Sequence, residues 1–513
     1  MAKICLSLTA KTLERDLEIL ESQRKYIDIA ELRVDCLDPD ERFLLRRFPE
    51  KAGLPVILSI RRTADGGNFV GGEGARIALF SRGLAFAEAD RRRNFAYVDL
   101  EEDLSVPSLI EAARAFGTRI IRSYHNMNGV DENLEGKLRG LRLIGDEIVK
   151  AALMPRSFDD LVKIYQAAKA TKDLEKILFG MGSLGLNTRI LAEPMGSHLT
   201  YAYVSGKGED DIYPPPEGMV EPKVLTDTFR FKNITSQTKL FAVTGYPLNI
   251  TVSPVFYNTV FSVEKTDAVL LPIQAESIKS FLSLAEELNI RGVSLATPHK
   301  ETVLPYLSWK SAEVISCGAC NTILNTPQGW NGYNTVLKGF TDSLLDFCGR
   351  KNLRWKKVTM IGAGGIARAA AAELYRLKAR VLILNRTPNK AWELASRYKG
   401  FAWAGLDRQG FDLIEKYNDI IIQATSLGMA PNSGADPLGF YDFSGKELIM
   451  DIVFAPEKTS FLKRAEKAGC RVIDGFDMLM RQARYQYKYF MGEEFPPSLI
   501  NRVGHREEFY ESE

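Results

Sequence analysis

The first 205 residues alternate short apolar segments with stretches of helical spacing, and this alternation restricts the possible folds more than any other feature. Eight segments have the length and composition of buried strands, and the stretches between them predict helices. The eight predicted strands are 4–8, 26–34, 55–61, 97–101, 119–124, 147–154, 176–182 and 199–204. Eight such repeats over about 230 residues are typical of a (β/α)8 barrel. An open doubly wound sheet is the alternative, and the count of eight and the charged residues at the strand ends favour the barrel.

The bulk composition argues against several classes of protein. Lys and Arg (67) nearly balance Asp and Glu (65), so no basic field indicates a nucleic-acid partner. No apolar run approaches the roughly 20 residues of a membrane span, and the N-terminus lacks a signal-peptide core. The six cysteines include a CGAC pair at 317–320, but with only four histidines we interpret it as packing at a turn rather than a metal or redox site. We therefore expect a soluble, cytoplasmic protein with no metal. The sequence does not predict its oligomeric state.

The later part of the chain predicts two further α/β domains. Residues 205–236 are rich in Pro, Gly and acidic residues, which is typical of a long loop and a domain junction. After it, a second strand–helix region extends to about residue 335, and a third begins with strand, glycine turn and helix. We predict a barrel over 1–232, a substrate domain over 237–337 joined by C-terminal helices at 476–510, and a Rossmann domain over 338–475.

Lys150 is the only charge in the apolar run IVKAALM of the sixth predicted strand. Burial there would disfavour the ammonium form and lower the pKa of this lysine. An uncharged amine in a closed barrel can attack a ketone and form an imine. The alternative is a lysine whose stem lies along the barrel wall while its head reaches water at the mouth.

Other polar residues lie near the ends of neighbouring predicted strands. His125 comes just past the end of the fifth strand, and Arg61 ends the third. Active sites of barrel enzymes lie at the carboxyl ends of the strands. A lysine, a histidine, carboxylates and arginines meeting there predict a site for a polar, anionic carbonyl compound. The remaining members of this group are Glu31, Arg33, Asp35 and Arg189.

These motifs together resemble a known family. ELRVD (31–35), SIR (59–61) with a following GG, SYHN (123–126), VKAALMP (149–155) and NTRI (187–190) are similar to the type I 3-dehydroquinate dehydratases. The resemblance implies that Lys150 forms a Schiff base with the substrate ketone and that His125 transfers protons. It implies that the substrate is bound by Glu31, Arg33, Arg61, Asp65 and Arg189. The chain departs from the family at Asp65, where Glu is usual, and at PPPEG (214–218), where a Pro-Gly-Gln lid motif is usual.

The third domain carries a dinucleotide-binding pattern. GAGGIAR (362–368) follows a predicted strand and opens an alanine-rich helix, where backbone N–H groups can bind a pyrophosphate. The next strand ends in Asn385, Arg386 and Thr387, with Lys390 close behind. A carboxylate there would repel a 2′-phosphate, whereas Arg386 attracts one, so NADP(H) is favoured over NAD.

A second group of polar residues lies in the substrate domain. Thr251 and Ser253 would face one way if extended, Lys300 ends ATPHK, Asn321 follows the CGAC pair, and Gln482 lies on a predicted helix. Each alone is consistent with a structural role.

In this order they resemble shikimate dehydrogenase over 238–510, and the whole chain resembles the plant-type bifunctional dehydratase–dehydrogenase family. The resemblance implies that Thr251, Ser253, Asn321 and Gln482 bind substrate and that Lys300 transfers a proton. It implies an NADP(H) site formed by Gly362, Ala363, Gly364, Gly365, Ile366, Ala367, Asn385, Arg386, Thr387, Lys390, Thr425 and Gly475.

One position of the dehydrogenase motif is altered. The stretch GYNTV (332–336) has Val336 where the family has an Asp that pairs with the catalytic lysine. Ser294 and Ala296 stand where Asn and Thr are common, and Phe454 replaces a usual tyrosine.

Three hypotheses follow. The first is a two-step enzyme that dehydrates 3-dehydroquinate and reduces 3-dehydroshikimate, the second step slowed. The second is a dehydratase with a non-catalytic or quinate-type dehydrogenase half. The third is a metabolite-sensing regulator, which the retained Lys150 and His125 oppose.

Overall fold

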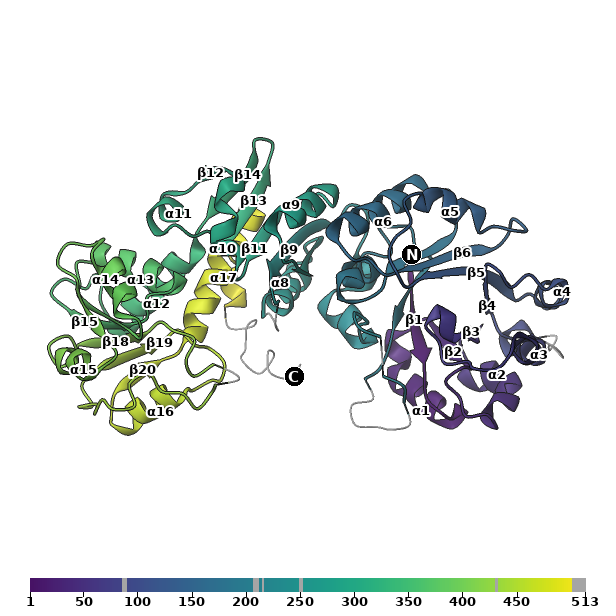
Figure 1. The fold of residues 1–513 in the computed structure, drawn as a ribbon, viewed down its shortest axis with the longest axis horizontal. Coiled ribbons are helices and arrows are strands. Elements are labelled where there is room, and N and C mark those ends of the chain that lie inside the picture. Colours follow the sequence, from purple (N-terminus) through teal and green to yellow (C-terminus); the bar gives the residue numbers. More distant parts are fainter. Residues whose placement is uncertain (85–89, 206–211, 215, 249–251, 430–431, 501–513) are drawn as a thin grey trace. The chain divides into compact units, whose positions relative to one another are not determined.

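The computed structural model describes the chain in two compact units. It covers residues 1–513 except 85–89, 206–211, 215, 249–251, 430–431 and 501–513. The first unit comprises Met1–Val243 with Pro247–Ile290, and the second comprises Thr244–Tyr246 with Arg291–Glu513 (Figure 1). Among the described residues, no helix is long and apolar enough to cross a membrane.

The first unit contains an eight-stranded parallel barrel, which confirms the prediction over the open sheet. Its strands follow the order β7-β6-β5-β4-β3-β2-β1-β8, and a single bridge between Lys176 and Ser197 nearly closes the circle. The strands are β1 (Lys3–Leu8), β2 (Ile29–Arg33), β3 (Val56–Ser59), β4 (Tyr97–Glu101), β5 (Arg119–Asn126), β6 (Ile148–Leu153), β7 (Lys176–Gly180) and β8 (Leu199–Ala202). Each of the eight predicted segments overlaps one of these strands, although β1 begins one residue before its segment and β5 ends two residues after its own.

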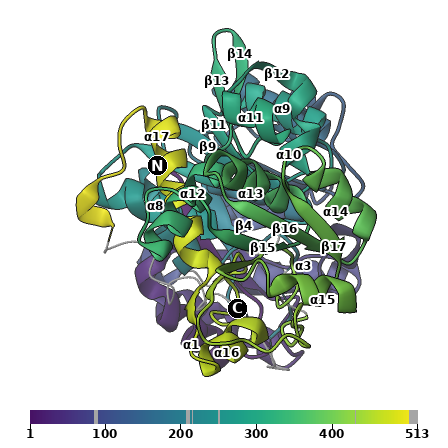
Figure 2. The same ribbon diagram turned by 90° about the vertical axis from the view of Figure 1, so that its left-hand side faces the viewer.

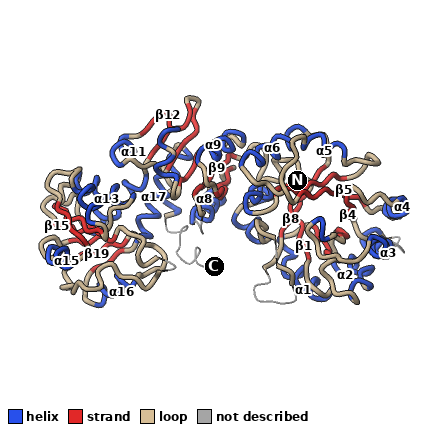
Figure 3. The backbone as a smooth tube through the Cα atoms, in the orientation of Figure 1, coloured by secondary structure: helices blue, strands red, loops and turns tan. Residues whose placement is uncertain are grey.

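Helices follow the first seven barrel strands and lie outside the strands in Figure 3. The eighth strand differs from the expected repeat, because within the described residues it is followed by the single π-helical turn Val224–Thr228 instead of an α-helix. The helices are α1 (Leu13–Gln23), α2 (Phe48–Ala52), α3 (Glu73–Leu84), α4 (Pro107–Ala115), α5 (Leu134–Gly140), α6 (Phe158–Ala170) and α7 (Leu186–Ile190).

A mixed sheet of six strands follows the barrel in sequence. Its order is β10-β9-β11-β13-β14-β12, so β10 and β12 are the edge strands. The strands are β9 (Lys239–Gly245), β10 (Ala268–Gln274), β11 (Gly292–Leu295), β12 (Leu307–Lys310), β13 (Thr322–Thr326) and β14 (Gly329–Tyr333). The helices between them are α8 (Val252–Val263), α9 (Ile278–Glu287), α10 (His299–Thr302) and α11 (Ala312–Cys317), and α12 (Thr335–Cys348) leads to the next sheet.

The second unit ends in a parallel sheet of Rossmann order. The sequence β17-β16-β15-β18-β19-β20 corresponds to the 3-2-1-4-5-6 order of dinucleotide-binding folds. The strands are β15 (Lys357–Ile361), β16 (Arg380–Asn385), β17 (Ala402–Gly405), β18 (Ile420–Gln423), β19 (Leu448–Asp451) and β20 (Arg471–Ile473). The helices are α13 (Gly365–Arg376), α14 (Pro388–Ala395), α15 (Arg408–Ile414), α16 (Ser460–Lys467) and α17 (Gly475–Met491).

Both faces of this sheet are covered by apolar helix faces. One core includes Phe340 of α12 and Leu374 of α13, and the other includes Ile414 of α15 and Phe461 of α16. Figure 2 shows the two pairs of helices on opposite sides of the strands. Helix α17 crosses α12 at Gly339, where a Cβ atom would lie 2.9 Å from the Met478 carbonyl oxygen. α17 ends at Met491, earlier than the predicted 476–510, and residues 501–510 lie outside the described part.

Candidate active sites

The inside of the barrel is built in two layers, because side chains two residues apart on a strand face the same way. The lower layer is mostly apolar and includes Cys5, Ile29, Ile57, Tyr97, Ile121, Ile148, Ile177 and Leu199. Two residues further along each strand, the parallel registers place a mostly polar layer: Ser7, Glu31, Ser59, Asp99, Ser123, Lys150, Phe179 and Tyr201. The apolar layer therefore supports a polar floor at the carboxyl ends of the strands.

Lys150 is fully buried in this floor, so its head does not reach water at the barrel mouth. Its Nζ lies 2.5 Å from an Asp99 carboxylate oxygen and 3.8 Å from Glu31 Oε1, and it sits 4.7 Å from the centre of the Tyr201 ring. Burial alone would raise the pKa of Asp99, but Lys150 and then Arg61 lower it overall. Asp99 is thus an ionised partner that the sequence analysis missed.

His125 lies within β5, one residue before its end, rather than past the strand as predicted. It is opposite Ala152 of β6, one inward position beyond the pair formed by Ser123 and Lys150. Both ring nitrogens are buried without a hydrogen-bond partner among the described residues. Burial, followed by the positive charges of Arg61 and Lys150, lowers the pKa of His125 well below its ordinary 6.5. The imidazole is therefore held in its neutral form, and neither ring nitrogen is occupied by a described residue.

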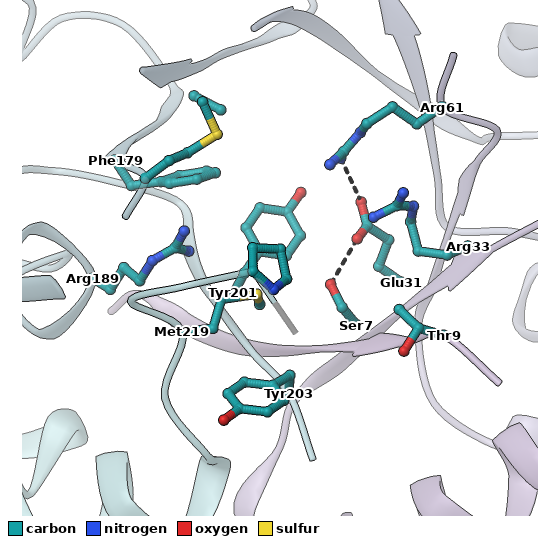
Figure 4. A pocket seen from close by; sticks show the side chains of 13 residues that line it. Ser7, Thr9, Glu31, Arg33, Arg61, Phe179, Arg189, Tyr201, Tyr203 and Met219 are labelled. Atoms are coloured by element: carbon teal, nitrogen blue, oxygen red, sulfur yellow. Dashed lines mark hydrogen bonds and ion pairs between the residues drawn. The ribbon is translucent and has the colours of Figure 1, made fainter. Parts of the chain in front are cut away.

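A cavity opens above the floor and is shown in Figure 4. Arg33 donates two hydrogen bonds to Asp35, at 2.9 and 2.7 Å, whereas Arg61 lies 3.5 Å from Glu31. Arg189 lies across the cavity from these two arginines, with Tyr201 between them. The lining residues are Ser7, Thr9, Glu31, Arg33, Arg61, Ala152, Phe179, Met181, Arg189, Tyr201, Tyr203, Pro216 and Met219.

Arg189 is the lining cation without a carboxylate partner in the described structure. Its Nε and Nη1 are buried and make no hydrogen bond there, and its guanidinium lies 4.4 Å from the Phe179 ring centre. Burial lowers the pKa of Arg189 to about 10. A buried guanidinium with unused donors favours an anionic ligand, because a carboxylate can accept two parallel hydrogen bonds from it.

The altered positions of the barrel lie in two different places. Asp65 pairs with Arg62 at 2.7 Å and does not line the cavity. The PPPEG segment does reach it, through Pro216 and the following Met219. Gly218 has a φ of +78°, and a Cβ atom there would lie 1.9 Å from the Gly182 oxygen, so only glycine fits this contact. Sequence analysis did not assign Pro216 or Met219, because no polar side chain marks them.

A second cavity, of about 250 Å³, lies in the second unit. Lys300 of α10 and Val336 of α12 both line it, and burial lowers the pKa of Lys300 below its ordinary 10.5. Glu301 is the only carboxylate among its described lining residues, and it pairs with Arg368. The lining residues are Thr297, Pro298, Lys300, Glu301, Ala319, Asn334, Val336, Gly365, Ile366 and Ala369.

Of the other residues assigned to the dehydrogenase substrate, the described Ser253, Asn321 and Gln482 are not among the lining residues of this cavity. Asn321 is buried and bonded within the protein, donating to Thr335 Oγ1 at 2.9 Å and accepting from the Thr335 N–H at 2.8 Å. Gln482 lies on α17, where its backbone contacts Gly339. Thr251 lies outside the described residues. Ser253 is helical, being the second residue of α8, so the condition of an extended backbone, under which it would face the same way as Thr251, is not met at Ser253.

The glycine turn has the geometry that a dinucleotide needs. Gly362 has a φ of +114°, and a Cβ atom there would lie 2.9 Å from a Thr425 methyl carbon. Gly364 and Gly365 face open space at the start of α13. The segment Gly362–Ala367 therefore leaves room for a pyrophosphate at a helix N-terminus. Gly475 instead lies against Ile452, whose carbonyl oxygen a Cβ atom would approach to 2.0 Å.

The end of β16 leaves positive charge accessible beside this turn. The Asn385 amide donates to the Thr387 carbonyl oxygen at 2.9 Å, which shapes the loop. Arg386, Thr387 and Lys390 are exposed. Two exposed cations at the end of the second Rossmann strand fit the 2′-phosphate of NADP. These positively charged side chains thus agree with the predicted cofactor, NADP(H).

A barrel with a buried lysine and a Rossmann domain with a lysine-lined cavity define a lyase–oxidoreductase class of protein. Residues 4–235 match the family model of type I 3-dehydroquinase. Residues 243–323 match the shikimate dehydrogenase substrate binding domain, and 348–430 match shikimate / quinate 5-dehydrogenase. The chain belongs to the shikimate dehydrogenase family, with a type I 3-dehydroquinase domain ahead of that part.

Two curated proteins illustrate the similarity. The chain is 27% identical over 526 residues to the "Bifunctional 3-dehydroquinate dehydratase/shikimate dehydrogenase, chloroplastic" of Arabidopsis thaliana, covering 98% of this chain and 84% of that protein. It is 32% identical over 272 residues to "Shikimate dehydrogenase (NADP(+))" of Caldanaerobacter subterraneus subsp. tengcongensis, covering 52% of this chain and 96% of that one. A solved structure, "Dehydroquinate dehydratase and shikimate dehydrogenase from S. pombe AroM", aligns with 96% of each chain at 21% identity and a TM-score of 0.42.

Proposed function

We propose that this chain is a bifunctional enzyme of the shikimate pathway. The barrel dehydrates 3-dehydroquinate to 3-dehydroshikimate, and the C-terminal half reduces that product to shikimate with NADPH. The observation that carries the proposal is the buried Lys150 on the polar floor, with the unpartnered His125 on the next strand. Neither a dehydratase with an inactive partner half nor a regulator is favoured, because family models of both enzymes match the chain.

The dehydration begins with attack of the Lys150 amine on the substrate ketone carbon. Asp99, 2.5 Å from Nζ, is placed to accept the proton that the amine loses, and water leaves as the imine forms. The protonated imine then withdraws electrons from the adjacent carbon. His125 removes a proton from that carbon, and the electron pair moves toward the imine nitrogen.

His125 then returns its proton to the departing hydroxyl as the carbon–carbon double bond forms. Water hydrolyses the imine, which frees Lys150 and releases the enone product. Arg189 binds the substrate carboxylate through its two unused donors, and Glu31, Arg33 and Arg61 bind the ring hydroxyls. We propose that Asp65 contacts the bound substrate only after its ion pair with Arg62 is broken.

In the dehydrogenase half, Lys300 donates a proton to the oxygen that forms from the substrate ketone. NADPH, when bound, supplies the hydride for this reduction. Gly362–Ala367 with Thr425 would hold its pyrophosphate, and Arg386 with Lys390 its 2′-phosphate. We keep four residues as the proposed substrate contacts of this half: Thr251, Ser253, Asn321 and Gln482.

The domain limits given in the sequence analysis remain predictions. The cytoplasmic location also remains a prediction, since the Arabidopsis relative is named as chloroplastic.

The proposed pair of activities is tested by supplying 3-dehydroquinate and NADPH to the full chain. We expect enone absorbance to appear first and NADPH absorbance to fall after a lag, because the second reaction uses the product of the first. With 3-dehydroshikimate supplied directly, the lag should vanish. A chain that forms no enone, or that never consumes NADPH with either compound, would contradict the proposal.

The choice of cofactor is tested at Arg386. We expect Arg386→Gln to raise the KM for NADPH by roughly tenfold to a hundredfold, because it removes a charge-assisted contact of about 1.5–3 kcal/mol to the 2′-phosphate. The KM for NADH, which lacks this phosphate, should change little. The nearby Arg397→Gln, further along the chain beyond α14, is the matched control. Equal losses with both nucleotides would mean that Arg386 supports the loop rather than the phosphate.

A further inference from the structure

Helix α7, which carries Arg189, is held to the barrel by close backbone contacts. The Thr188 hydroxyl donates to the Gly185 carbonyl oxygen at 2.6 Å and accepts from the Gly180 N–H at 2.8 Å. A Cβ atom on Gly185 would lie 2.2 Å from the Gly180 oxygen. A helix of five residues has little stability of its own, so its position depends on such contacts.

Helix α7 also makes a hydrogen bond to a strand from the dehydrogenase half of the sequence. The Asn187 amide donates a hydrogen bond of 2.8 Å to the Pro272 carbonyl oxygen of β10. Both residues belong to the first unit, and Asn187 is 6% exposed. Because β10 is an edge strand, its outer carbonyl groups have no neighbouring strand to bond. Asn187 thus satisfies one of them from the barrel.

Among the described residues, the Asn187 side chain makes no hydrogen bond other than this one. Its Oδ1 is buried without a partner among the described residues. Two residues further along the helix, the Arg189 guanidinium rests on Phe179 and also has no carboxylate to fix it. The direction of the Arg189 side chain is therefore determined by the backbone of α7, and the position of α7 is determined in part by the Asn187 hydrogen bond.

We propose that Asn187 is a positioning residue for the dehydratase, through which β10 of the dehydrogenase half determines how well Arg189 binds the anionic substrate. The proposal rests on the dehydratase function proposed above. Lys150 and His125 lie on β6 and β5, not on α7. Losing the hydrogen bond should therefore weaken substrate binding and leave the chemical step intact.

The test is Asn187→Leu in the full chain, since leucine has a similar volume and cannot donate. We expect the KM for 3-dehydroquinate to rise by about fivefold, the lower end of typical coupling effects, while kcat stays within about twofold of the wild type. Lys169→Ala is the matched control. Lys169 of α6 pairs with Glu287 of α9, which joins the same two parts of the unit without touching α7. Its KM should equal that of the wild type.

The outcomes separate this inference from the function on which it rests. A wild-type chain that forms no enone overturns the dehydratase proposal itself. An active wild type with an unchanged KM in Asn187→Leu overturns only the role of Asn187, as does an equal rise of KM in Lys169→Ala. If Asn187→Leu does not fold, Asn187→Ala removes the donor without adding bulk and carries the same expectation.

Discussion

Replacing Lys150 with Met should abolish the dehydratase, with kcat falling by roughly 10⁴-fold or more, because loss of a nucleophile removes the covalent route. Methionine fills a similar volume but has no amine to form an imine. Borohydride added with 3-dehydroquinate should increase the mass of the wild-type chain by the reduced adduct and leave Lys150→Met unchanged. An adduct on the variant would place the nucleophile at another lysine.

The same substitution should also destabilise the fold. Asp99 is buried 2.5 Å from Lys150 Nζ, and Glu31 lies 3.8 Å from it. Removing the cation leaves the buried Asp99 without its hydrogen-bonded partner and leaves Arg61 as the nearby positive charge, and breaking such a buried pair typically costs about 3–5 kcal/mol of unfolding free energy. Adding Asp99→Asn should restore much of this stability and none of the activity. Urea unfolding of the single and double variants measures the difference, and a single variant as stable as the wild type would show that Asp99 is neutralised in another way.

Lys150→Met also separates the two halves of the proposed pathway. In this variant, NADPH consumption with 3-dehydroshikimate should persist, because Lys300 lies in the second unit. With 3-dehydroquinate alone, consumption should cease. Continued consumption would mean that the dehydrogenase half reduces 3-dehydroquinate directly, as a quinate dehydrogenase would.

The barrel could be predicted from the sequence because its signals are local. Each strand is a short apolar run, and the first seven are each followed by a stretch of helical spacing, so the eight-strand count needs no knowledge of contacts. Lys150 was conspicuous for the same reason, as a single charge in an apolar run. The local sequence could not show whether the head of Lys150 reaches water or stays buried. In the structure it is buried and paired with Asp99, which lies 51 residues away in the sequence.

Asp99 itself escaped prediction because it alternates with apolar residues in YVDLE, as many outward-facing polar residues do. Only the registers of β4, β5 and β6 place it on the inner face beside Lys150. The local conformation at Ser253 was also not evident from the sequence. Ser253 would face the same way as Thr251 only on an extended backbone, but α8 begins at Val252. Pro254, which suggests a break, is tolerated in the first turn of a helix because its missing N–H has no partner there.

Val336 is the altered position of the dehydrogenase motif, and it lies in the dehydrogenase cavity. Val336 is 5% exposed and belongs to the same apolar core as Phe340, yet it lines the cavity together with Lys300. Without a carboxylate at this position, burial lowers the pKa of Lys300 and nothing opposes it. The nearby Asp342 is not a substitute, since it accepts a hydrogen bond from the Tyr485 hydroxyl and does not line the cavity.

We expect Val336→Asp to raise kcat for 3-dehydroshikimate reduction by about 10²-fold, the lower end of what a positioned acid–base partner contributes. The carboxylate would hold Lys300 in its charged form and orient it toward the substrate oxygen. The sign of the pH effect follows. Because burial lowers the Lys300 pKa, the wild type loses the proton-donating form at a lower pH than an ordinary lysine, whose pKa is 10.5. Val336→Asp should move the alkaline limb of the kcat profile to higher pH.

Val336→Asn is the matched control, because it has the size and polarity of Asp without the charge. If the gain comes from the charge, Val336→Asn should keep the wild-type rate and the wild-type alkaline limb. Urea unfolding of both variants measures what the polar group costs the core around Phe340. An equal gain in both variants would mean that polarity rather than charge assists Lys300. No gain in either would mean that Lys300 already works without a carboxylate at this position, and Glu301 would then be the group to replace next, because it is the one acid lining the described cavity.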